Sequence, residues 1–567
     1  MKLGIPGGFS GYIGEFLTQF YYLSFVGPLI IAGLLFALRQ VVKHILSEIS
    51  HNPALFPLSF IPSLVLAMIL CSEFYPLSAV IGFVTAMLTA LAYVRIRKHR
   101  SRFVAGIIFI PLTYWLTGGS SLSLLSMMLV YELVLYLRSR GNGSSGKDTF
   151  NPYTLKWQHI AAYLLAGSGI LLIAGKYFIM QPLKITLIGR FYNNIVNNIP
   201  AAILFLFVLP PLLMLAVYFI TLKDKYAKTA LVLQTVAFVI LAIAGVKHFA
   251  NFEAEQIMRY DYLVRNEKWK EVIRYADKKP PRNFLSLAML NLSLAKTDQL
   301  GNRMFSYDQH GINGLFLPFN REYVGAIMGN EIFYHLGLIN ASQQYVFESM
   351  ETIPSRSKST RVIKRLAETN LINGQYKVSE KYLTILEKTI FYRKWANATR
   401  IILYDEEKIN NDHDWGEKRR FMVRNDYFFH IKNIEAVLNR MVKEHPDNKM
   451  AFEYLMAYYM INKDLRNLVT FIPVMEKMNY NKVPVSYQEA IMYIIGLNNE
   501  DPMINSPVYV TKNTRLRMQS YSDIFNRYPD AKERLEERFS DTYWFYLHFK
   551  EVEPSQAEEK TNNTGST

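Results

Sequence analysis

Two apolar runs flank a basic segment in residues 77–117, LSAVIGFVTAMLTALAYVRIRKHRSRFVAGIIFIPLTYWLT. Each run approaches the roughly 20 residues that a helix needs to cross about 30 Å of hydrocarbon. Between the runs lie Arg95, Arg97, Lys98, Arg100 and Arg102. Because short loops rich in Lys and Arg stay in the cytoplasm, the segment predicts two membrane helices joined on the cytoplasmic side.

The same alternation extends over residues 1–250, which contain eight apolar runs. They lie at 20–38, 58–72, 77–94, 103–117, 121–137, 159–179, 201–222 and 229–249. Three of the runs, the second, fourth and fifth, are short, with prolines at or near their ends, so seven spans is the alternative to eight. The pattern predicts an all-α, polytopic transmembrane bundle of about eight spans in residues 1–250.

The basic residues fix the orientation of this bundle. The first, third, fifth and seventh gaps between runs hold fourteen lysines and arginines, whereas the opposite side has only Lys2, Lys176, Lys184, Arg190 and Lys247. We therefore expect the N-terminus, and everything after residue 250, to lie outside the cytoplasm.

The charge balance supports the same interpretation. Residues 1–250 carry 19 Lys and Arg against six acids, and the rest of the chain accounts for only +3 of the formal +16. A pI near 9.4 therefore reflects loops that flank the membrane, which argues against nucleic-acid binding. Cys71 is the one cysteine, so no disulfide holds the second half together.

Residues 251–550 show mixed polar and apolar residues at helical spacing. Three stretches resemble tetratricopeptide repeats, around 263–276, 366–386 and 455–472. Their uneven spacing predicts a degenerate array of helical hairpins, with a plain helical bundle as the alternative. No glycine or proline occurs between Gly245 and Pro280, so the last membrane helix is expected to continue into this domain. Residues 551–567 lack apolar periodicity and are expected to be a disordered tail.

The whole chain resembles a family of uncharacterised bacterial inner-membrane proteins with several spans and a C-terminal tetratricopeptide-like half. The resemblance depends on these stretches: Asn266-Glu267-Lys268-Trp269, Leu285 to Leu300 leading to Phe305-Ser306-Tyr307, Gly374-Gln375-Tyr376 and Tyr392-Arg393-Lys394-Trp395. It implies the two-part layout, a location in the inner membrane of a bacterial cell envelope, and no particular activity.

Two groups of residues in the membrane half are candidate sites. Glu132 is the one acid well inside an apolar run, and it is either a proton, cation or substrate site or a hydrogen-bonded packing residue. A second group is a candidate external mouth, unless its members are ordinary interfacial residues: Glu15, Glu73, Arg190, Asn194 and Asn197.

In the second half, residues 304–325 interrupt the helical pattern with aromatic and polar side chains. This candidate binding loop contains Tyr307, Asp308, His310, Phe316, Phe319 and Arg321; such a loop binds a partner or a bilayer surface, or fills the array from inside. Asp412-His413-Asp414 lacks further ligands at metal spacing and is expected to be a solvated turn. No metal or cofactor is expected.

Two functional hypotheses follow. The preferred one is a non-enzymatic envelope protein, in which the membrane half anchors and orients a helical domain that binds a protein partner. The alternative is a membrane enzyme or transporter that acts on a lipid-linked glycan, with the helical domain docking a partner or acceptor. The sequence contains no HExxH, GxxxxGK[ST], paired CxxC or GxSxG motif, which disfavours catalysis of the soluble type.

Overall fold

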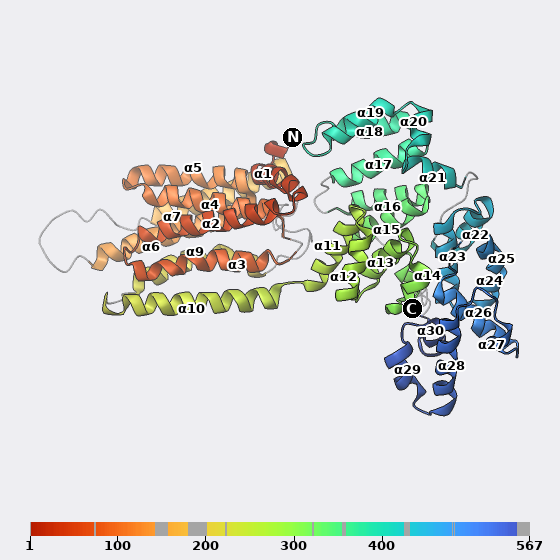
Figure 1. The fold of residues 1–567 in the computed structure, drawn as a ribbon. Helices are drawn as coiled ribbons and strands as arrows, with labels where there is room; N and C mark the ends of the chain where they lie inside the picture. Colours follow the sequence, from red (N-terminus) through yellow and green to blue (C-terminus); the bar gives the residue numbers. More distant parts are fainter. Residues whose placement is uncertain are drawn as a thin grey trace, which may run out of the picture. The chain divides into compact units, whose positions relative to one another are not determined.

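The computed structural model describes residues 2–72, 75–141, 157–179, 201–220, 224–319, 322–353, 359–423, 431–478, 480 and 482–552. Every regular element in these ranges is a helix, so the predicted all-α class is confirmed. The chain divides into two compact units, Met1–Asn251 and Phe252–Thr567, which Figure 1 shows in colours that follow the sequence.

The first unit is a bundle of apolar helices. Its helices are α1 (Gly8–Thr18), α2 (Val26–Ser47), α3 (Ile61–Ile69), α4 (Leu77–Arg95), α5 (His99–Thr117), α6 (Ser121–Gly141), α7 (Trp157–Ile173), α9 (Ala201–Phe219) and α10 (Asp224–Phe249). A 3-10 segment, η3 (Pro53–Phe60), precedes α3. Each of the eight apolar runs overlaps at least one of these elements, and α1 is a helix that the sequence did not predict.

Several of these helices are long and apolar enough to cross a membrane. The described residues contain five such segments: Val26–Ser47, Leu77–Arg95, His99–Arg138, Gln158–Phe178 and Ala227–Phe249. The third of them includes both α5 and α6, which meet at Gly118, where φ is +66°. Two shorter apolar helices are Ala54–Ile69 and Ile203–Phe219. The count of eight spans therefore stays a prediction.

Helix α4 is the centre of the bundle. It packs against α1, α2, α5 and α6, and most of its side chains are buried, including Phe83, Met87 and Tyr93. Helix α10 is the opposite case, because its apolar side chains are mostly exposed, as at Leu233 and Ile243. An apolar surface of this extent is typical of a face that lipid or another apolar partner covers.

Two prolines inside α9 interrupt its backbone hydrogen bonds in an apolar environment. Pro211 has no N–H, so the carbonyl of Phe207, four residues earlier, loses its helical donor. The hydroxyls of Ser123 and Ser126 on α6 lie 3.1 Å and 3.4 Å from this carbonyl oxygen and donate to it. The two serines thereby join α6 to α9 through a backbone group that hydrocarbon would leave unsatisfied.

Glycines let α1 approach α4 very closely. A Cβ at Gly14 would lie 2.7 Å from backbone atoms of Ser78. Gly8 and Gly11 are buried on the same face of α1, which Figure 1 shows at one end of the bundle. The contact therefore depends on the absence of side chains at this spacing.

The second unit consists of short helices. They are α11 (Phe252–Arg265), α12 (Trp269–Lys278), α13 (Phe284–Lys296), α14 (Leu300–Arg303), α15 (Tyr323–Leu336), α16 (Ile339–Thr352), α17 (Thr360–Ile372), α18 (Tyr376–Leu386), α19 (Arg393–Ile402), α20 (Glu406–Asn411), α21 (Trp415–Phe421), α22 (Ile434–Glu444), α23 (Lys449–Ile461), α24 (Leu465–Thr470), α25 (Ile472–Lys477), α26 (Val485–Leu497), α27 (Pro502–Asn505), α28 (Lys512–Arg527), α29 (Ala531–Phe539) and α30 (Tyr543–Phe549).

The expected continuous helix across residues 245–280 is wrong. Helix α10 ends at Phe249 and α11 begins at Phe252. Asn251 lies directly before α11, and Glu253 and Glu255 occupy its first turn. Asparagine before a helix and acids in its first turn are signals for a new start, and they outweigh the absence of glycine and proline.

Consecutive helices of the second unit form hairpins, including α15–α16, α17–α18, α22–α23 and α28–α29. Gly374 ends α17 with φ at +73°, and Gln375 N–H donates to Asn370 O at 2.8 Å, which closes the helix in a Schellman motif. The hairpins do not form a simple row, because α23 and α26 return to pack against α13 and α14. The assignment to a tetratricopeptide-like array stays a prediction.

The α1–α4 contact can be tested by adding one methyl group. Gly14→Ala puts a Cβ against the backbone of Ser78, and we expect a loss of about 1–3 kcal/mol because neither backbone can yield locally. The measurement is the thermal midpoint of the protein purified in detergent. Gly33→Ala on α2 is the matched control, since a Cβ there meets no atom within 4 Å. Equal midpoints for the two variants would show that the close approach is absent.

Candidate functional site

Glu132 lies in a polar cluster that four helices of the first unit build. Arg102 on α5 donates to its carboxylate from Nε at 2.7 Å and from a terminal nitrogen at 3.4 Å. The hydroxyl of Tyr93 on α4 donates to the same carboxylate at 2.8 Å. Tyr93 also shares a hydrogen bond of 3.1 Å with the hydroxyl of Tyr163 on α7.

The cluster carries no net charge, because one guanidinium faces one carboxylate. Arg102 is only 1% exposed, and its remaining donors include one to Ile96 O at 3.1 Å. The sequence placed Arg102 in a cytoplasmic loop, whereas it lies inside α5. A buried pair with these hydrogen bonds is suited to holding α4, α5, α6 and α7 together.

Most of the candidate external mouth lies outside the described residues. This holds for Glu73, Arg190, Asn194 and Asn197. Glu15 is described and lies half-exposed on α1. The structure therefore provides no geometry for the mouth as a whole.

The candidate binding loop is divided between core and surface. Phe316 is fully buried against Phe333 and Tyr454, and the hydroxyl of buried Tyr307 donates to Asp277 at 2.6 Å. Asp308 is exposed and pairs with Lys550 at 2.8 Å, and His310 is half-buried. Phe319 is 42% exposed, and Arg321 lies outside the described residues. These side chains do not converge on one surface.

Buried hydrogen bonds hold this loop inside the second unit. Asn291 on α13 donates to the side-chain oxygen of Gln309 at 3.1 Å and to Gly314 O at 2.8 Å. The hydroxyl of Tyr345 on α16 donates to Leu317 O at 2.7 Å. The buried part of the loop thus fills space among α13, α15, α16 and α23.

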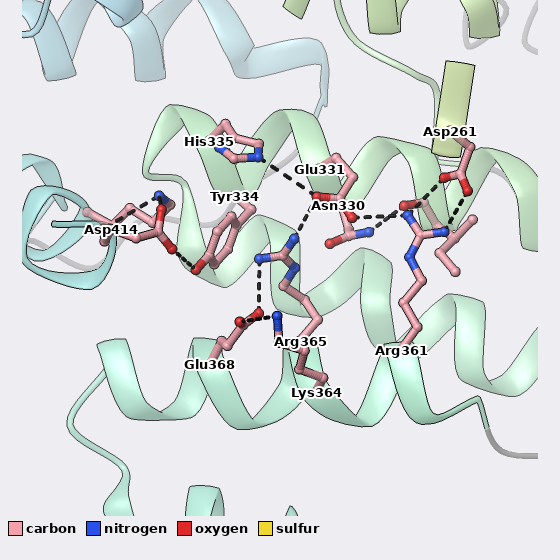
Figure 2. A network of polar contacts seen from close by, with 12 residues as sticks. Asp261, Asn330, Glu331, Tyr334, His335, Arg361, Lys364, Arg365, Glu368 and Asp414 are labelled. Atoms are coloured by element: carbon pink, nitrogen blue, oxygen red, sulfur yellow. Dashed lines mark hydrogen bonds and ion pairs between the residues drawn. The ribbon is translucent and has the colours of Figure 1, made fainter. Parts of the chain in front are cut away.

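A second ion-pair network lies in the second unit and was not recognised from the sequence. Figure 2 shows it between α15 and α17, with Asp261 and Asp414 at its two ends. Arg361 binds both oxygens of Asp261 at 2.8 Å and donates to Glu331 at 3.1 Å. Arg365 donates to Glu331 at 2.6 Å. Glu331 is thereby shared by two arginines one helical turn apart on α17.

Arg365 also connects Glu331 to the other end of the network. Its guanidinium donates to Glu368 at 3.1 Å and lies 3.5 Å above the ring of Tyr334. Lys418 on α21 lies 4.5 Å from the same ring and pairs with Asp414, which accepts a hydrogen bond of 2.6 Å from the Tyr334 hydroxyl. Two cations near one aromatic ring therefore join α15, α17 and α21.

The network is balanced in charge and largely removed from water. It contains four acids and four bases: Asp261, Glu331, Glu368 and Asp414 with Arg361, Lys364, Arg365 and Lys418. Burial opposes ionisation of Glu331, yet Arg365 and Arg361 hold its pKa below the ordinary value. With every carboxylate paired, the network has the character of a structural clamp and not of a metal site.

Asp412-His413-Asp414 has two structural uses. Asp414 belongs to the network, and Asp412 Oδ1 accepts the backbone N–H groups of Asp414 and Trp415 at the start of α21. Among the residues that the structure describes, no group of three or more His, Cys, Asp or Glu side chains is placed to hold a metal ion.

His335 lies at the edge of this network without a strong partner. Its Nε2 is 4.0 Å from Glu331, its Nδ1 has no hydrogen-bond partner among the described residues, and its ring meets Trp269 edge-on at 5.0 Å. Burial, together with Lys296, Lys418 and Arg365, holds the pKa of His335 well below 6.5. The side chain is therefore neutral in the folded protein at neutral pH.

An open groove of about 1010 Å³ lies between α22 and the α24–α25 segment. Its floor includes Tyr459 of α23, whose hydroxyl accepts a hydrogen bond from Asn439 at 2.8 Å and donates to Glu435 at 3.1 Å. The groove is lined by Glu435, Ala436, Asn439, Arg440, Val442, Lys443, Glu444, Pro446, Tyr459, Asn467, Thr470, Phe471 and Val474. In the sequence, Tyr459 lies within the repeat-like stretch at 455–472 and has no feature that marks a groove.

Removing one partner of the Arg102–Glu132 ion pair is expected to destabilise the protein more than replacing both partners with apolar residues. Arg102→Met leaves Glu132 buried without its cation, so we expect a loss of about 3–5 kcal/mol. The double variant Arg102→Met with Glu132→Leu removes both charges and should recover most of that loss. Thermal midpoints in detergent provide the comparison. A single variant as stable as the unaltered protein would contradict the structural role of the pair.

The low pKa of His335 predicts acid sensitivity of the second unit. Below pH 6.5 the unfolded chain protonates this histidine while the folded protein does not, so stability falls as the pH drops below that value. His335→Phe keeps a ring beside Trp269 and removes the titration. We expect a smaller loss of thermal midpoint from about pH 7.5 to about pH 5.5 in the variant than in the unaltered protein. Equal losses would assign the acid sensitivity to other groups.

Comparison with known proteins adds the family and no activity. Residues 1–550 match a family model described as a family of unknown function (DUF6057). No curated protein matches the chain, and no solved structure does. The match covers nearly the whole chain, so the protein belongs to this family of unknown function.

Proposed function

We propose that this protein is an integral membrane protein of a bacterial envelope that holds a helical unit outside the cytoplasm to bind a polypeptide partner. The first unit is the membrane anchor, and the second unit is the binding module. The observation that carries the proposal is the open groove between α22 and α24–α25.

The membrane part of the proposal is supported by apolar surface and charge placement. The outer helices of the first unit expose large apolar side chains, including Leu29, Phe36 and Leu233, as lipid contact requires. Eight crossings with the four basic gaps in the cytoplasm would leave both the N-terminus and the second unit outside.

The groove has the surface chemistry of a peptide-binding site. Phe471 and Val474 provide apolar contact, and Thr470 and two asparagines provide polar contact along its walls. The side-chain amide of Asn439 donates to Tyr459, and that of Asn467 donates to Asp464 at 2.7 Å. Neither amide oxygen has a donor among the described residues, so both can accept backbone N–H groups of a bound chain.

The charged residues of the groove favour a polypeptide over a small ion. Arg440 and Glu444 pair with each other at 2.7 Å, and Glu435 accepts the Tyr459 hydroxyl. These contacts leave Glu435 and Lys443 without an ion-pair partner among the described residues, so the groove offers one free charge of each sign. A volume of about 1010 Å³ is at the upper end of the range for small-molecule pockets, so an extended segment of several residues fits it.

Site-specific crosslinking tests this proposal. In a Cys71→Ser background, Asn439→Cys and Thr470→Cys would be modified with a membrane-impermeant maleimide that carries a benzophenone, applied to the outer face of sealed membranes. Illumination is expected to join both groove positions to the same polypeptide, because both line one groove.

Two controls sharpen the result. Ile401→Cys on α19 is 79% exposed and outside the groove, so it should be modified without forming the adduct. Ala436→Trp fills the groove and should abolish the adduct at Thr470→Cys. The binding site would be refuted if the adduct at Thr470→Cys persisted in the Ala436→Trp variant. It would also be refuted if neither groove position formed an adduct. Modification only after the membrane is opened would refute the orientation.

A further inference from the structure

Helix α1 lies across one end of the bundle of the first unit. The N–H of Gly7, directly before α1, donates at 2.9 Å to the carbonyl of Trp115, two residues before the end of α5. Gly14, seven residues later, packs on Ser78, the second residue of α4. Helices α4 and α5 are consecutive and joined by a short turn, so the start of α4 and the end of α5 lie at the same end.

The dimensions agree with a crossing and not with a parallel alignment. Seven helical residues extend about 10 Å, which is close to the 8–10 Å that separates the axes of two packed helices. Helix α1 therefore bridges α5 and α4 at one level. This end is opposite the basic segment of residues 95–102, so in the proposed orientation it faces the outer leaflet.

The two faces of α1 differ sharply. The face toward the bundle consists of the small residues Gly8, Ser10, Gly11 and Gly14, all buried. The opposite face carries exposed aromatic side chains, with Phe9 at 36%, Tyr12 at 53% and Phe16 at 40%. Three aromatics at helical spacing form one stripe along an 11-residue helix.

The surroundings of this stripe indicate what covers it. From Leu3 to Leu38 the one charged residue is Glu15. Beyond the stripe, exposed Tyr22 and Phe25 lead directly into α2, whose exposed Leu29 and Phe36 belong to the apolar outer surface of the bundle. The aromatic stripe is thus followed in the chain directly by residues of the surface that lipid covers in the proposed anchor.

We propose that α1 is an in-plane helix whose residues Phe9, Tyr12 and Phe16 contact the head-group boundary of the outer lipid leaflet. Aromatic rings concentrate at this depth because they combine an apolar body with polarisable or hydroxylated edges. The glycine face supports this placement, because it packs closely on the bundle and leaves the aromatic rings on the exposed side of α1. This inference depends on the membrane anchor proposed above.

Spin-label depth measurements test the inference in the full-length protein. Cys71→Ser removes the single native cysteine, and nitroxides are placed one at a time at Phe9→Cys, Tyr12→Cys and Phe16→Cys, in vesicles of phosphatidylcholine and phosphatidylglycerol. The depth of each nitroxide follows from the ratio of its relaxation by lipid-dissolved oxygen to its relaxation by a water-soluble nickel complex. We expect the three labels at one shallow depth, because an in-plane helix keeps its residues level.

Leu29→Cys and Phe36→Cys on α2 are the matched controls, since they are also seven residues apart and exposed. Along a crossing helix they should differ in depth by about 10 Å. A similar difference between positions 9 and 16 would overturn the in-plane assignment. Labels at positions 9, 12 and 16 that are relaxed by the nickel complex and not by lipid-dissolved oxygen would also overturn it. If the α2 labels then still lie in lipid, the membrane anchor stands. Water exposure of the α2 labels as well would refute the anchor itself.

Discussion

Pairing of charge away from water is the constraint on which both units depend. An isolated buried charge costs several kcal/mol, so Glu132 must meet Arg102, and Glu331 must meet Arg361 and Arg365. In each case the partners come from different helices, and the requirement therefore fixes how helices pack. The first pair connects α4, α5, α6 and α7 with two tyrosines, and the second connects α11, α15, α17 and α21. Ion pairs removed from water thus determine helix packing in both units, although the surfaces of the two units differ strongly.

Much of the helical content of the first unit is predictable from its sequence, because each of the eight apolar runs overlaps a helix of the structure. The partner of Glu132 is not predictable in this way. Arg102 stands among basic residues that flank a span, and only the packing of α5 on α6 distinguishes it from its neighbours. Helix α1 was also missed, because glycines at every third position lower helix propensity and hide the close contact that they permit.

In the second unit the sequence predicts the class of element better than its arrangement. Helix ends such as Gly374 follow local rules, whereas the position of the loop at residues 304–325 depends on Asn291 and Tyr345, which no local pattern connects to it. The groove is also not predictable from the sequence, because the exposed faces of the helices that form its walls have the composition of ordinary solvated surface. The break at Asn251 has a local signal, because an asparagine and two acids at the start of α11 favour a new helix even where glycine and proline are absent.

The return of α23 and α26 to the surface of α13 and α14 has a mechanical consequence. At Gly301, α14 lies so close to α26 that a Cβ would meet Pro484 at 2.8 Å, and Asn302 accepts the N–H of Val485. A linear solenoid lengthens by adding repeats and frays from its ends. Here Asn302 and Val485, 183 positions apart, are hydrogen-bonded, so the helices between them cannot lengthen as a row of repeats does without breaking this contact.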